Sequence, residues 1–257
     1  AAASVSPAVR PIRGLSLDIL TALRWEIHGR RPPPLASPAV VGIYYVAQQV
    51  ASLPQKLKTS FDPILGPVIT RNLQTKNYGE IARQVGQVGF WIIAAQAGIA
   101  LALGIPGGAV MGLVGPQFVG GMGALAFLLA AEVAAATAVV SESALVYMAR
   151  HRNLLISLAM LAVQALVSVG LIQLVDTLSV KPEMRGLYQA AAVACGLMIS
   201  LGLGSIIKAR LLSRLLGHPI SIWRGALVWA VLAASMLGII IVSLPPRFEW
   251  VELAIGV

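Results

Sequence analysis

Six long apolar stretches, joined by short loops, decide what this chain can fold into. A helix needs roughly 20 mainly apolar residues to cross the hydrocarbon core of a bilayer, and each stretch reaches that length. With 58% hydrophobic and 11% charged residues, a water-soluble fold could not bury so much apolar surface. We therefore predict an all-α fold, a polytopic membrane helix bundle of about six transmembrane helices. The stretches lie near residues 39–70, 81–104, 118–148, 154–175, 186–207 and 224–244.

The two ends of the chain differ from the predicted bundle, which occupies residues 39–245. Residues 1–38 are rich in arginine and proline and contain no apolar core of a signal peptide, so we expect them to be poorly ordered or out of context. Residues 246–257 enter a further apolar segment and read as a truncated C-terminal segment. We expect the chain to be part of a longer membrane protein.

Basic residues gather in alternate loops. The intervening loops hold either no charge, over residues 106–118, or two acidic and two basic residues, over residues 176–186. Because Lys and Arg accumulate on the cytoplasmic side of membrane proteins, we expect the three basic loops to face the cytoplasm. The net charge of +9 is spread over separate loops, which argues against nucleic acid as a partner. The basic loops contain Arg71, Lys76 and Arg83; Arg150, His151 and Arg152; and Lys208, Arg210, Arg214 and His218.

No pattern of catalytic or metal-binding residues is present. The lone Cys195 lies in mid-span, and the three histidines are far apart in sequence, in or beside loops. A membrane-embedded glycosyltransferase should carry a large outer loop with acidic pairs or arginine clusters, but the longest loop between the stretches has about 14 residues. We expect no enzyme activity, no metal and no cofactor.

A polar stripe runs along the first apolar stretch. Its members fall within a sector of about 80° on a helix, and a stripe of this length cannot face lipid because its polar groups would lack partners. Polar contacts between packed helices are one explanation, and the wall of a hydrophilic cavity is the one we favour. Lys58, at the inner end, would line this cavity or serve as an interfacial anchor. The predicted cavity residues are Tyr44, Gln48, Ser52, Gln55, Lys58, Thr59 and Asp62.

Glu132 lies near the centre of the third stretch, between Ala131 and Val133. A charged side chain at that depth costs about 2.5–3.5 kcal/mol on insertion scales, so intramembrane acids are candidates for function. We predict that Glu132 is an ion-coupling residue that binds and releases a proton. The alternative is a protonated acid that donates one structural hydrogen bond. Gln164, with Ser157 and Ser168 on the same helix face, is a further cavity candidate.

Small residues recur every fourth position at Ala192, Gly196, Ser200 and Gly204. This spacing aligns them on one helix face, where they let a neighbouring helix approach closely. We expect this face to be a packing seam.

Two runs resemble a known family. The run VVGIYYVAQQVASLPQKLKTSFDPILGPVITRNLQTKNYGEI, residues 40–81, is similar to the start of the second half of polysaccharide flippases, which belong to the multidrug/oligosaccharidyl-lipid/polysaccharide exporter superfamily. The run GLVGPQFVGG, residues 112–121, resembles an outer loop of the same family. The resemblance covers roughly residues 36–245 and gives the same orientation as the charges.

The resemblance implies a transporter of the bacterial inner membrane, of which this chain is the C-terminal half. Such a protein would move undecaprenyl-diphosphate-linked oligosaccharide across the membrane by alternating access, for lipopolysaccharide or exopolysaccharide biosynthesis. Its expected partners are the lipid-linked oligosaccharide, membrane lipid and the missing N-terminal half of the transporter. A drug/cation antiporter of the same superfamily and a non-transporting membrane fragment are the alternatives.

Overall fold

The computed structural model describes the backbone of residues 38–220 and 225–243, and the side chains of these residues except 56–65 and 239–243. Our expectations for the N-terminal segment (1–38) and the C-terminal segment (246–257) fall outside this part of the chain, apart from Pro38. Within it the regular structure is entirely helical, as the apolar stretches predict. The helices are α2 (Pro38–Ala51), α3 (Leu53–Gln74), α4 (Tyr78–Gly104), α5 (Gly107–Val114), the 3₁₀ helix η2 (Pro116–Gly121), α6 (Met122–Met148), α7 (Arg150–Thr177), α8 (Pro182–Leu216) and α9 (Gly225–Ser243).

Four of the described helical segments are long and apolar enough to cross a membrane. They are α4, η2 with α6, α7 and α8, and they correspond to the second to fifth predicted spans. The sixth stretch forms α9, whose described apolar part, Gly225–Gly238, is shorter. The chain is thus a helical bundle of membrane-spanning character, while the number of six spans stays a prediction.

The first predicted span is divided into α2 and α3 at Ser52, which keeps helical backbone angles (φ −76°, ψ −12°). Ser52 separates α2 from α3, and Pro54 stands within the first two positions of α3. Proline has no backbone N–H to donate, and its ring clashes with the carbonyl group one turn earlier. It therefore interrupts the hydrogen bonding of a continuous helix. At the break, the Ser52 amide donates to the Gln48 carbonyl at 3.0 Å, and the Gln55 amide donates to the Ser52 carbonyl at 3.1 Å.

The central helix of the bundle is α6, which packs against α2, α3, α4, α7 and α8. Its first half belongs to an apolar cluster with α2, α5 and α8, built around Leu125 and Leu129. Its second half belongs to another cluster with α3, α4 and α8, built around Val140 and Leu145. Alanine at many α6 positions, including the fully buried Ala131 and Ala144, lets neighbouring backbones come close.

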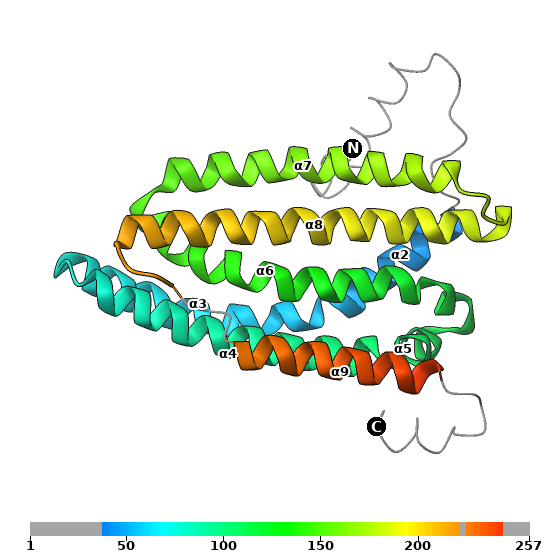
Figure 1. Ribbon diagram of the computed structural model, residues 1–257, viewed down its shortest axis with the longest axis horizontal. Helices are drawn as coiled ribbons and strands as arrows, with labels where there is room; N and C mark the ends of the chain where they lie inside the picture. The colour runs from blue at the N-terminus through cyan, green and yellow to red at the C-terminus, as the bar shows by residue number, and fades with distance from the viewer. Residues whose placement is uncertain (1–37, 221–224, 244–257) are drawn as a thin grey trace, which may run out of the picture.

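The ends of the bundle reproduce the charge alternation of the sequence. The α3–α4 and α6–α7 connections and the C-terminal end of α8 lie at one end of the molecule, and the α5–η2 region and the α7–α8 connection lie at the other (Figure 1). The three basic loops therefore share one end, as the predicted topology requires. At the opposite end, the α7–α8 hairpin is closed by Arg185, whose guanidinium lies 2.8 Å from the Asp176 carboxylate.

The small-residue face of α8 is a packing seam, as expected. Ala192, Gly196, Ser200 and Gly204 are all buried. The Ser200 hydroxyl donates to the Met160 carbonyl of α7 at 2.7 Å, and Gly204 lies beside the Met160 side chain. The seam therefore joins α7 to α8.

The tightest point of the seam yields a stability prediction. A Cβ atom at Gly196 would overlap the Ser168 hydroxyl and lie 3.1 Å from the Ser168 Cα atom. We expect Gly196→Ala to destabilise the protein by about 1–3 kcal/mol, because overpacking would separate α7 from α8. Thermal unfolding in detergent measures this. Gly170→Ala on α7, where the added Cβ meets nothing within 4 Å, is the matched control. Equal unfolding midpoints for Gly196→Ala and Gly170→Ala would contradict the assignment of this α8 face as a packing seam.

The shared end of the basic loops yields a topology prediction. In a Cys195→Ala background, Thr75→Cys at the basic end should react with an impermeant thiol reagent only from the cytoplasm, because positive loops stay inside. Gln117→Cys in η2, at the opposite end, should react only from outside. Both side chains are exposed, so access to the reagent does not limit labelling. Labelling of Thr75→Cys from outside would reverse the orientation.

Candidate functional site

The structure brings a predicted cavity residue and the predicted coupling residue together. The Gln55 Nε2 atom of α3 donates to the Glu132 Oε1 atom of α6 at 2.5 Å. Gln55 directly follows Pro54, so the contact is made at the break between α2 and α3. The carboxyl group of Glu132 thereby has a polar partner within an otherwise apolar stretch of α6, which a buried or lipid-facing acid requires.

A second polar side chain reaches the same break from α4. Gln96 is 2% exposed, and its Nε2 atom donates to the Pro54 carbonyl at 3.3 Å. Its Oε1 atom is buried and has no hydrogen-bond partner among the described residues. Sequence analysis missed Gln96, although an uncharged polar residue deep in an apolar span is a recognisable signal. The break is thus the meeting point of α3, α4 and α6 polar groups.

The rest of the stripe lies at the edge of the bundle. Ala47, Ala51 and Pro54 form the buried face of the α2–α3 segment. Gln48 and Gln55 are exposed beside that face, and Tyr44 is partly buried against the outer apolar cluster. The Ser52 hydroxyl donates to the Gln49 carbonyl at 2.7 Å, so it satisfies local backbone at the break.

Four predicted cavity residues are not placed with this group. The side chains of Lys58, Thr59 and Asp62 fall outside the described residues. Gln164 lies on α7, on the same face as Ser157 and Ser168, whose contacts are with α8. Gln164 is therefore directed toward α8 rather than toward the α2–α3 stripe.

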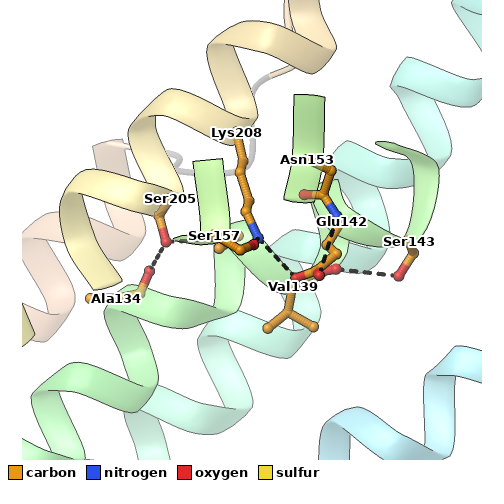
Figure 2. Close-up of polar contacts among 9 residues, drawn as sticks. Ala134, Val139, Glu142, Ser143, Asn153, Ser157, Ser205 and Lys208 are labelled. Carbon is orange, nitrogen blue, oxygen red and sulfur yellow. Dashed lines mark hydrogen bonds and ion pairs between the residues drawn. The ribbon is translucent and has the colours of Figure 1, made fainter. Parts of the chain in front are cut away.

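A separate polar cluster joins three helices near the basic end, as Figure 2 shows. The Lys208 Nζ atom of α8 lies 3.0 Å from Glu142 Oε2 of α6 and 3.0 Å from the Ser157 hydroxyl of α7. The Asn153 side chain of α7 donates to Glu142 Oε1 at 3.3 Å. One turn before Lys208, the Ser205 hydroxyl donates to the Ala134 carbonyl at 2.5 Å.

The two charges in this cluster differ in exposure. The Lys208 side chain is 8% exposed and the Glu142 side chain 43% exposed. The sequence places Lys208, Arg210 and Arg214 in a basic loop, and the structure corrects this, because all three lie in α8, which ends at Leu216. Lys208 therefore stabilises packing rather than marking a loop. Since Glu142 neutralises a buried ammonium, it has a structural use that its position in the sequence did not reveal.

No protein-family model matches the chain, and no curated protein or solved structure matches it. The two polar clusters are the candidates for a functional role in the described part of the chain. The Lys208 cluster can fasten α6, α7 and α8 together. The Gln55–Glu132 contact places an intramembrane carboxyl group beside the proline interruption between α2 and α3.

The unequal exposure of the Lys208–Glu142 pair yields a prediction. Glu142→Ala would leave a buried ammonium without its counter-ion, and we expect it to lower the free energy of unfolding by about 3 kcal/mol. Lys208→Met removes the buried charge and keeps an apolar stem of similar length, so we expect a change below about 1 kcal/mol. Thermal unfolding of the two single variants and of the double variant in detergent gives a double-mutant cycle, which measures the interaction between Lys208 and Glu142. If Lys208→Met were the more damaging, the ammonium itself would be required.

Proposed function

We propose that this chain is one half of a transporter that moves lipid-linked oligosaccharide across a bacterial inner membrane by alternating access. The bundle of apolar helices and the resemblance of residues 40–81 and 112–121 to polysaccharide flippases support this proposal. The observation that carries it is the hydrogen bond between Gln55 and Glu132 at the α2–α3 break.

A broken helix beside an intramembrane carboxyl group is well suited to transport. Many secondary transporters bind substrate and coupling ions where a membrane helix is discontinuous, because the break exposes backbone polar groups inside the membrane. Here Pro54 interrupts the helix, Gln96 contacts the backbone of the break, and Glu132 contacts the next residue. Polar groups of α3, α4 and α6 thus converge where Pro54 interrupts the α2–α3 segment.

Protonation of Glu132 would change the strength of its contact with Gln55. An ionised carboxylate accepts a charge-assisted hydrogen bond, which is roughly twice as strong as a neutral one. A proton on Glu132 would therefore loosen the hold of α6 on α3 and favour bending at Ser52. Because a ligand shifts a conformational equilibrium only by binding its two states differently, this difference is what couples a proton to the movement.

The exposed edge of the stripe suits the substrate. The sugar and diphosphate headgroup needs a polar path, while the polyprenyl tail can stay in lipid. Gln48 and Gln55 offer amide groups on a surface that the other half of the transporter would cover. Lys58, Thr59 and Asp62 are the further cavity residues that the sequence predicts. The substrate would thus pass between the two halves.

A drug/cation antiporter is the second candidate, because the Gln55–Glu132 contact would serve proton coupling for an organic cation equally well. The two candidates differ in cargo. Transport of a lipid-linked oligosaccharide by reconstituted full-length protein supports the first, and proton-driven efflux of an organic cation supports the second.

We predict that Glu132→Gln abolishes pH-dependent transport in the full-length transporter reconstituted in liposomes, while lipid-linked substrate still binds. The amide keeps the shape of the side chain and can hydrogen-bond to Gln55 but cannot titrate. Glu132→Asp should retain part of the activity. Movement of fluorescent lipid-linked oligosaccharide at two values of internal pH measures this. Full pH dependence in the Gln variant would make Glu132 a structural residue only.

Gln55, the hydrogen-bond partner of Glu132, yields a second prediction. Gln55→Leu should lower the transport rate about tenfold, as expected for loss of a hydrogen bond to a charged group, while membrane insertion and abundance stay normal. Val41→Leu, at a position of α2 that is 45% exposed, is the matched control and should leave transport unchanged. Normal transport in Gln55→Leu would mean that the stripe serves packing alone.

A further inference from the structure

Two arginines near the end of α8 stand between two hollows on the surface of the bundle. One hollow, of about 420 Å³, lies between the start of α7 and the end of α8. The other, of about 510 Å³, lies around Gly217, where α8 ends. Arg210 and Arg214 line both hollows. These two side chains, one helical turn apart, therefore separate the two hollows at this end of α8.

The first hollow is strongly positive. Arg152 of α7 adds a third guanidinium, and the residues that line the hollow include no acid. In the described part of the chain no carboxylate forms an ion pair with any of the three arginines, and Glu142 is paired with Lys208 instead. Three neighbouring like charges repel one another unless an anion lies among them. Guanidinium groups match phosphate oxygens in geometry as well as charge.

The walls of the same hollow are apolar. Leu155 and Ile156 of α7 and Ile207 and Leu211 of α8 line it together with the arginines. Away from the basic end, exposed apolar side chains continue the surface, with Leu158 of α7 at 55% and Leu203 of α8 at 44% exposure. Only 6% of the most apolar window of α7 is buried within the bundle, so most of its apolar surface is left exposed. The hollow therefore combines a positively charged end, formed by the arginines, with an apolar surface that continues along α7 and α8.

We propose that the hollow between α7 and α8 binds an anionic phospholipid of the surrounding bilayer. Its phosphate would lie among Arg152, Arg210 and Arg214, and an acyl chain would follow the exposed leucines and isoleucines of α7 and α8. Basic pockets between membrane helices on the cytoplasmic side bind anionic lipid headgroups in this way. A soluble anion would use the arginines but leave the apolar walls in contact with water. The lipid would hold the start of α7 and the end of α8 at the membrane interface.

The test titrates the purified full chain in detergent with phosphatidylglycerol and follows its thermal unfolding. We expect phosphatidylglycerol to raise the midpoint and phosphatidylcholine to have little effect. For the double variant Arg210→Gln/Arg214→Gln, the half-maximal concentration of phosphatidylglycerol should be about thirty-fold higher, since each basic residue near an anionic surface contributes roughly a fivefold factor. Both side chains are exposed, so the variant should fold normally.

The double variant Arg71→Gln/Lys76→Gln is the matched control. It removes two exposed charges at the same end of the bundle, outside the hollow, and should keep the wild-type response. Equal stabilisation by phosphatidylcholine, or an equal loss in the control variant, would overturn the site. If inorganic pyrophosphate, at matched ionic strength, stabilised the protein as much as phosphatidylglycerol does, the arginines would bind a soluble anion. That result would overturn the proposed lipid site.

Discussion

The close approach of α6 to α8 is the contact on which the rest of the structure depends. Inside a membrane, apolar surface gains little by leaving lipid for protein, so helices associate through tight packing and through polar contacts. Small residues on both helices, such as Ala131 of α6 and Ala194 of α8, provide that fit with fully buried side chains. The same approach brings Lys208 within reach of Glu142 and the Ser205 hydroxyl within reach of the α6 backbone. Around this pair, α7 packs on α8, and α2, α3 and α4 pack on α6.

The two polar clusters use this frame in different ways. The Lys208 cluster ties together helices that already pack along most of their length, and its buried ammonium is matched by a partner from each neighbouring helix. At the α2–α3 break, Pro54 interrupts the helix and a buried Gln96 oxygen has no hydrogen-bond partner in the described part of the chain, as is also true of a buried Asn153 oxygen in the Lys208 cluster. In the proposed transport cycle, the α2–α3 segment would move at the break while α6 and α8 stay packed together.

Sequence reasoning identified features that depend on composition and spacing. The depth of Glu132, the angular range that Gln48 and Gln55 share, and the four-residue spacing of the seam are properties of one helix at a time. It was wrong about Lys208, because counting charges near the end of an apolar stretch does not show where the helix stops. It did not pair Asp176 with Arg185 or Glu142 with Lys208, two ion pairs that the structure shows. Both pairs join different helices, so no single-helix pattern contains them.

The sequence by itself determined that the chain forms long apolar helices and that its basic loops share one end of the bundle. These properties follow from length, hydropathy and charge, which act on each segment separately. Only the tertiary structure decided which polar groups meet. Gln55 and Glu132 are 77 positions apart, and Lys208 and Glu142 are 66 positions apart, so each contact depends on how three or more helices pack. The partner of a polar group inside the membrane is set by the packing around it, because a group that cannot reach water must pair with whichever helix lies beside it.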